Sequence, residues 1–202
     1  MEKLDNTKIE FWNKFKRWHL DDIDICLANN ANYAATKTML SLIDSLGGFY
    51  GGLIEYNNIY YVPAGGGSRS KKIYDINNKS FEKSGSKKQF LNFTKNYLHE
   101  FFETKLPFGK NIRLSDVLYE HFRCGIIHEG QPKFGTGITE ENTPIVIYTN
   151  YKNIPVVLNI LALRDMLRRA VFEYERDLSD NKQPERMIRW QIRYDFLTQL
   201  KF

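Results

Sequence analysis

The stretch Leu118–Lys133 reads LYEHFRCGIIHEGQPK and is the most informative part of the chain. Its apolar residues recur at helical spacing, and Gly130 and Pro132 then supply the signals that end a helix. Arg123 precedes His128 by five positions. A guanidinium offers a planar fork of donors to phosphate oxygens, and an imidazole exchanges a proton near neutral pH. The pair is therefore a candidate site for chemistry on a phosphodiester.

The spacing of this pair constrains how the two side chains can meet. On an ideal helix, five residues turn about 140° beyond one full circle and rise about 7.5 Å. Arg123 and His128 would then lie on different faces unless the helix ends or distorts between them, and Gly125 would allow such a distortion. Two other arrangements would also join them. The long arginine side chain could reach around the helix, or two copies of the chain could bring their motifs together.

The phrase FRCGIIHEG, at Phe122–Gly130, resembles the R-x4–6-H motif of HEPN domains, the "higher eukaryotes and prokaryotes nucleotide-binding" superfamily. The stretches FLNFTKNY at 90–97 and LIDSLGG at 42–48 resemble the layout of the same family. The resemblance covers about residues 22–178, and the nine-residue phrase is its specific part. It implies a HEPN-like up-and-down helical bundle that often dimerises through the motif helices.

Many HEPN members are metal-independent RNases, often in toxin–antitoxin or defence systems, and others are inactive RNA-binding or assembly modules. The resemblance implies that His128 acts as general base or acid at the ribose 2′-OH. It also implies that Arg123 holds the scissile phosphate, so that cleavage leaves a 2′,3′-cyclic phosphate and needs no cofactor. Cys124 stands where active members commonly carry a polar residue.

Two functions therefore stay open at this point. The first is a metal-independent endoribonuclease, with RNA as substrate, a second copy in a homodimer and a protein antitoxin as expected partners. The alternative is a catalytically inactive HEPN dimer that binds RNA, a nucleotide or a protein.

Four further residues are candidates to support the pair. Cys124 is adjacent to the arginine. Asp44 lies on a predicted helix and would either orient the arginine or the histidine, or face water. Glu129 adjoins the histidine, although neighbours in sequence point in different directions on a helix. Arg164 falls on the apolar stripe of a predicted helix, where it would either snorkel outward or add a phosphate contact.

A zinc site is the alternative that the same stretch supports. His121, Cys124 and His128 are spaced at i, i+3 and i+7, so they share one face of an unbroken helix. All three are zinc-ligand types. No fourth ligand is evident nearby in the sequence, and Gly125 disfavours a continuous helix. The expectation is therefore that no metal is bound, and that a small thiol packs beside partly buried imidazoles.

The composition of the chain is that of a globular protein. It has 202 residues, of which 42% are hydrophobic and 26% charged, and this fits a single domain over residues 1–202. The net charge of +5 allows a nucleic-acid partner without demanding one. Two cysteines cannot form a disulfide framework. No apolar run reaches the ~20 residues of a membrane span, and no signal-peptide core is present, so we expect a cytoplasmic protein without membrane contact.

Hydrophobic periodicity predicts an all-α fold of five to six helices. A helix start is expected at Asp21–Asp22 and a helix end at Gly47–Gly48. Asn29, Asn30 and Asn32 are weak helix formers, so a kink or break near them is also open. The predicted helices cover 4–20, 22–46, 87–104, 115–130, 156–178 and 184–199.

Two small insertions, at about 51–86 and 133–155, interrupt this helical pattern. In the first, which is rich in glycine, either Ile59–Val62 pairs with Lys72–Ile76 as a hairpin, or much of the segment is a solvated loop. In the second, the β-branched run Ile145–Tyr148 predicts a hairpin or an extended arm.

Overall fold

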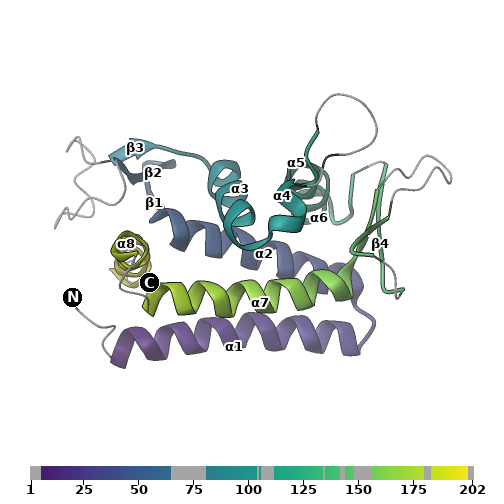
Figure 1. Cartoon of the computed structure of the whole chain (residues 1–202), viewed down its shortest axis with the longest axis horizontal. Helices are drawn as coiled ribbons and strands as arrows, with labels where there is room; N and C mark the ends of the chain where they lie inside the picture. The colour runs from purple at the N-terminus through teal and green to yellow at the C-terminus, as the bar shows by residue number, and fades with distance from the viewer. Residues whose placement is uncertain are drawn as a thin grey trace.

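The computed structural model describes residues 6–64, 81–103, 105, 112–133, 135–141, 144–147, 156–179 and 183–199. Over these residues the chain is mainly helical with two small sheets, as the sequence predicts (Figure 1). The helices are α1 (Asn6–Ala28), α2 (Asn32–Gly51), α3 (Ser86–Tyr97), α4 (His99–Glu103), α5 (Leu114–Val117), α6 (Cys124–Glu129), α7 (Ile160–Ser179) and α8 (Pro184–Gln199), with a π-helical segment, η2 (Leu118–Arg123), between α5 and α6.

The long helices α1, α2 and α7 run side by side, and α2 is antiparallel to α1 (Figure 1). The shorter helices α3 to α6 lie over α2 on the side away from α1 (Figure 1). Aromatic rings fill the space between α1, α2, α7 and α8, with Trp12, Phe49, Tyr174 and Trp190 in ring contact. In the part of the chain that the structure describes, no helix has both the length and the apolar character needed to cross a bilayer.

The first two helices meet near Asn29–Asn30, where the weak helix formers allow a break, and not at Asp21–Asp22. The expected helix start at Asp21–Asp22 is wrong, because α1 continues through both residues, which are exposed on its surface. The chain turns at Asn29–Asn30 instead, where Asn30 adopts a left-handed φ of 55°. Asparagine tolerates this conformation better than most other residues, so the break falls at the asparagine pair.

The end of α2 also differs from the prediction. Gly47–Gly48 does not end the helix, which continues to Gly51 before Gly52 caps it at a left-handed φ of 65°. The inner glycines serve close packing instead. A Cβ on Gly47 would lie 2.7 Å from the backbone oxygen of Gln89, so α3 approaches α2 more closely there than any side chain would allow.

The remaining helices agree with the prediction except at two places. The segment α5–η2–α6 and helix α8 match the expected ranges closely. The helix predicted over 87–104 is interrupted at Leu98, a buried residue with non-helical backbone angles that separates α3 from α4. The helix predicted from Val156 begins four residues later, because Val156–Asn159 forms a strand. The Asn159 side chain then caps α7 by accepting hydrogen bonds from the next turn.

The first insertion forms an antiparallel sheet of strands β1 (Ile54–Tyr56), β2 (Ile59–Pro63) and β3 (Phe81–Lys83). β1 and β2 form a hairpin across Asn57–Asn58, and both asparagines have the positive φ that a two-residue turn requires. The predicted strand Ile59–Val62 is therefore present. Its predicted partner, Lys72–Ile76, lies outside the described residues.

The second insertion contributes to a mixed sheet of strands β4 (Thr136–Thr139), β5 (Val146–Ile147) and β6 (Val156–Asn159). β4 pairs with β6 in parallel, and β5 pairs with β6 antiparallel. The extended segment predicted around residues 145–148 is thus confirmed in part. Its partner strand, β6, directly precedes α7, and the hydrophobic periodicity assigns this stretch to the helix.

We predict that Gly47→Ala lowers the free energy of unfolding by about 1–2 kcal/mol, because overpacking against the α3 backbone outweighs the gain in helix propensity. Gly48→Ala is the matched control in the same helix. The nearest atoms to its Cβ would be those of the Arg193 side chain, at an ordinary contact distance of 3.4 Å, so the unfolding free energy should stay equal or rise. Urea denaturation checks both variants, and equal stability of the two would contradict this packing.

Candidate functional site

The motif lies on one continuous helical run, α5–η2–α6, that contains a wide turn. The N–H of Cys124 donates to the carbonyl oxygen of Tyr119, an i to i+5 bond that is typical of a π-helix. Such wide turns are common at functional sites. Gly130 then ends the run at a left-handed φ of 77°.

Gly125 plays a different part from the one that the sequence predicts. The helix neither ends nor breaks between Arg123 and His128, and the wide turn ends at the arginine. Instead, Gly125 lets the following segment fold back against the helix, because a Cβ there would lie 2.7 Å from the backbone nitrogen of Lys133. That nitrogen donates a hydrogen bond of 3.0 Å to the carbonyl oxygen of His121.

Arg123 and His128 meet within one chain. The Nη1 atom of Arg123 lies 3.2 Å from Nε2 of His128, on the surface of the protein. A guanidinium can only donate, so Nε2 is the unprotonated, accepting nitrogen of the imidazole in this contact. Of the three arrangements open from the sequence, the structure shows the long arginine side chain reaching to the histidine. A second copy is not needed to bring the two groups together.

Asp44 holds the arginine from the neighbouring helix. The Nε–H of Arg123 donates to Oδ2 of Asp44 over 2.7 Å, and the two side chains are 16% and 20% exposed. Asp44 lies on α2, where the helix faces η2 and α6. Its second oxygen, Oδ1, is buried and has no hydrogen-bond partner among the described residues. We refer to Asp44, Arg123 and His128 as the Arg123 cluster.

Burial affects the two members of this ion pair differently. Burial raises the pKa of Asp44 above its ordinary value, against the opposing attraction of Arg123 and a smaller one of His128. Burial lowers the pKa of Arg123, but the attraction and hydrogen bond of Asp44 outweigh it and leave that pKa raised. Burial acts on the two pKa values in opposite directions because it disfavours the charged form of each group, which is the deprotonated acid and the protonated base. The guanidinium stays charged throughout the accessible pH range.

The aromatic ring of Tyr119 also contacts the guanidinium of Arg123. The guanidinium carbon of Arg123 lies 5.3 Å from the centre of the Tyr119 ring, within cation–π range. Lys87 contacts the same ring at 5.9 Å and forms ion pairs with Glu120 and Asp116. The arginine is therefore fixed by a carboxylate and an aromatic face, while its Nη atoms point to the histidine.

The other predicted site residues lie outside the Arg123 cluster or at its edge. Cys124 is half-buried beside the arginine and adds a small favourable interaction with it. Glu129 is exposed and lies 3.9 Å from Nζ of Lys133. Arg164 pairs with Asp165 and lines a shallow hollow between α1 and α7, to which neither α2 nor α6 contributes.

The alternative zinc site finds no support in the geometry. His121, Cys124 and His128 share the helical run, but within the described residues no group of three His, Cys, Asp or Glu side chains is placed to hold a metal ion. His121 is half-buried, and its Nδ1 has no hydrogen-bond partner in that part of the chain.

Comparisons of the chain with protein-family models, with curated proteins and with solved structures find no match. The resemblance to the HEPN superfamily therefore gains no support from relatives. The functional interpretation rests on the geometry of the Arg123 cluster.

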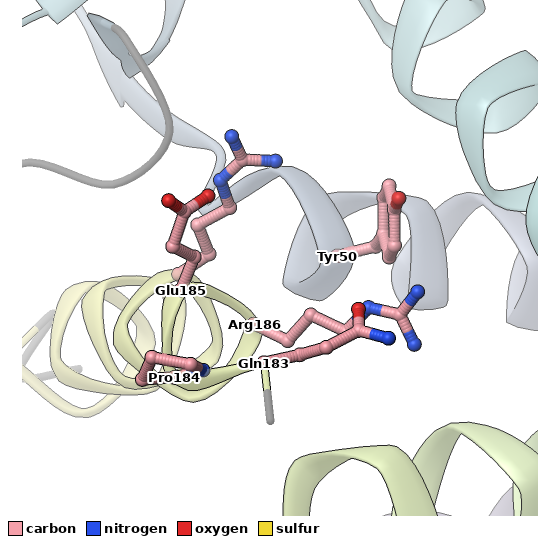
Figure 2. A pocket seen from close by; sticks show the side chains of 6 residues that line it. Tyr50, Gln183, Pro184, Glu185 and Arg186 are labelled. Atoms are coloured by element: carbon pink, nitrogen blue, oxygen red, sulfur yellow. The ribbon is translucent and has the colours of Figure 1, made fainter. Parts of the chain in front are cut away.

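A second polar cluster lies at the junction of α2, α3, α7 and α8, and the sequence does not predict it. Arg186 donates to the Tyr97 hydroxyl at 2.6 Å and forms an ion pair with Asp177. Figure 2 shows Arg186 beside Tyr50 in a cavity of about 340 Å³. Tyr50 and Tyr97 are far from Arg186 in the sequence, so no local sequence pattern predicts that they meet. Because Arg186 already has a carboxylate and a hydroxyl as partners, this cluster ties the helices together.

We predict that Arg123→Ala lowers the free energy of unfolding by about 1–3 kcal/mol at neutral pH, because it leaves the half-buried Asp44 carboxylate without its counter-ion. Arg123 lowers the pKa of Asp44 in the folded state. The loss should therefore shrink as the pH falls through the pKa of Asp44, where the carboxyl becomes neutral.

Urea denaturation across the acid range measures this pH dependence. The control is Arg164→Ala, which removes an arginine whose ion pair, in the part of the chain that the structure describes, is with the exposed Asp165. It should change the stability by less than about 0.5 kcal/mol. A loss for Arg123→Ala that does not depend on pH would show that the ion pair contributes nothing.

Proposed function

We propose that the chain is a metal-independent endoribonuclease of the HEPN type, in which Arg123 and His128 act on the RNA backbone. The observation that carries this proposal is the 3.2 Å contact between Arg123 Nη1 and His128 Nε2 at the protein surface. The pair joins a fixed positive charge to an unprotonated nitrogen. Cleavage of RNA through its 2′-OH needs both groups at one place.

The contact between the two side chains indicates how a substrate would activate the site. A phosphate group is a better acceptor for a guanidinium than a neutral imidazole is, because it carries a negative charge. When the scissile phosphate takes over the donor of Arg123, Nε2 of His128 is released. That nitrogen can then take the proton of the ribose 2′-OH. Binding of the substrate to Arg123 therefore also makes His128 available as the general base.

The chemical step balances without a metal or a redox partner. The 2′-oxygen forms a bond to phosphorus and its proton passes to His128, while the bond from phosphorus to the 5′-oxygen breaks. The leaving 5′-oxygen takes up a proton, and a 2′,3′-cyclic phosphate remains. Arg123 stabilises the charge that develops on the phosphoryl oxygens.

In this proposal Asp44 is a positioning residue. It accepts the Nε–H of Arg123, while Nη1 contacts His128. Its negative charge also offsets part of the positive charge of the site, so a tight ground-state complex with phosphate is not favoured. Asp44 thus contributes to the orientation of the arginine more than to affinity.

We predict that the protein cleaves single-stranded RNA in the presence of EDTA, and that His128→Ala lowers the cleavage rate at least about 100-fold, because it removes the general base. Gel electrophoresis of an end-labelled RNA gives the rate, and mass spectrometry identifies the cyclic phosphate. Glu129→Ala is the matched control on the neighbouring exposed residue and should retain the rate. Equal activity of wild type and His128→Ala, or cleavage of an all-deoxy substrate, would contradict the proposal.

We also predict that Asp44→Ala lowers kcat by about 10- to 100-fold with little change in KM, because a misdirected guanidinium still attracts phosphate but no longer meets the transition state. Asp44→Asn keeps an oxygen that accepts from Nε and should recover part of the rate. A rise in KM with unchanged kcat would instead assign Asp44 a role in binding.

A catalytically inactive RNA-binding module is the second candidate. The Asp44 carboxylate beside Arg123 favours it, because that carboxylate repels an incoming phosphate. Cys124 also departs from the polar residue of active HEPN members. For this candidate, filter binding would detect RNA retained by the protein, Arg123→Ala would weaken the retention, and no variant would change a cleavage rate.

A further inference from the structure

The outward face of α1 carries the two most exposed large apolar side chains of the described residues. Trp18 is 61% exposed and Ile25 is 60% exposed. They are seven residues apart, so they lie on one stripe of the helix. The core-facing residues of α1, including Trp12 and Ile23, lie on the opposite face. A tryptophan this exposed commonly marks an interaction surface.

Two opposite charges flank Trp18 along the same stripe. Lys14 lies four residues before it and Asp21 three residues after it, and both are exposed. Among the described residues, Lys14 pairs only with Glu10, in an ion pair whose members are 50% and 66% exposed. Such a solvated pair is weak and leaves the lysine available for another carboxylate. Asp21 makes no ion pair with the described residues.

We propose that this face docks a second copy of the chain, with α1 packed antiparallel against α1. A twofold axis beside Trp18 brings the two Trp18 rings together. The same axis places Lys14 of one protomer opposite Asp21 of the partner subunit, and the exchange is reciprocal because the interface is isologous.

The charges decide between the two orientations of the helices. A parallel arrangement would place lysine against lysine and aspartate against aspartate, which is repulsive. Only the antiparallel arrangement brings the two Trp18 rings together and at the same time sets Lys14 opposite Asp21. This self-complementarity indicates a second copy of the chain, rather than another protein, as the occupant of the surface.

This interface is distinct from the one that the HEPN resemblance implies. α1 lies on the far side of α2 from α5 and α6 (Figure 1). A dimer through α1 therefore leaves both Arg123 clusters open to solvent on its outer sides. The inference does not depend on the proposed nuclease function, since its readout is the oligomeric state and not cleavage.

Sedimentation equilibrium of the full chain tests the proposal. We expect a wild-type dimer, and a dissociation constant that rises roughly 30-fold or more in Trp18→Ala. Phe172→Ala is the matched control. Phe172 is 56% exposed on α7 and contacts α1 at Lys16, which lies away from the Trp18 stripe. Its removal should leave the dimer intact. All these positions are exposed, so circular dichroism should show an unchanged fold.

A charge exchange makes the test specific to the antiparallel register. Lys14→Asp and Asp21→Lys should each weaken the dimer, and the double variant should restore most of the lost affinity because each pair is re-formed with reversed sign. Three results would overturn the proposal. They are a wild-type monomer at roughly 0.1 mM, a dimer that Trp18→Ala leaves unchanged, and a double variant no better than the single ones.

Discussion

The ion pair between Asp44 and Arg123 is the interaction on which the candidate site depends. An arginine on a surface helix is ordinarily a long, solvated side chain with many rotamers. Here a carboxylate from α2 binds its Nε and the Tyr119 ring lies against its guanidinium, so one conformation is selected. That conformation is the one that reaches His128. Without the contact to α2, the spacing of the motif would leave the two side chains on different faces of the helix.

This arrangement has a cost that a purely structural ion pair would avoid. One oxygen of Asp44 is buried without a hydrogen-bond partner among the described residues, and burial raises the pKa of the carboxyl. Replacing a half-buried ion pair by apolar residues is often neutral or stabilising. In the proposed function, this pair directs one donor at the exposed imidazole.

The helix α2 determines where the site can form. Its glycine-rich end admits the α3 backbone at Gly47, and Asp44 lies one turn earlier, where η2 and α6 pack on the helix. Close approach of the α3 backbone to α2 requires the absence of a side chain at Gly47. The wide turn of η2 then sets the rotation of Arg123 toward α2. Packing constraints on the core and the geometry of the site are therefore coupled through one helix.

Local patterns in the sequence predict the helical class, helix α8 and the run that carries the motif. They also single out Asp44, although they leave open whether it contacts the arginine or faces water. The incorrect or missing predictions have three physical causes. Glycine in a helix reads as an end when it serves a close contact, as at Gly47. A strand continuous with a helix, as at Val156–Asn159, has no boundary in the hydrophobic pattern. Tertiary contacts, such as those of Arg186 with Asp177 and Tyr97, do not produce a pattern in the local sequence.

The central claim is that a fixed guanidinium donates to an unprotonated Nε2 of His128. Long-range ¹H–¹⁵N correlation spectra of the histidine ring at neutral pH test it directly, because they distinguish the two neutral tautomers. The structure predicts that the neutral ring of His128 carries its proton on Nδ1, and that Arg123→Ala removes this preference. A ring protonated on Nε2 in the wild-type protein, or a tautomer that does not respond to loss of Arg123, would contradict the account.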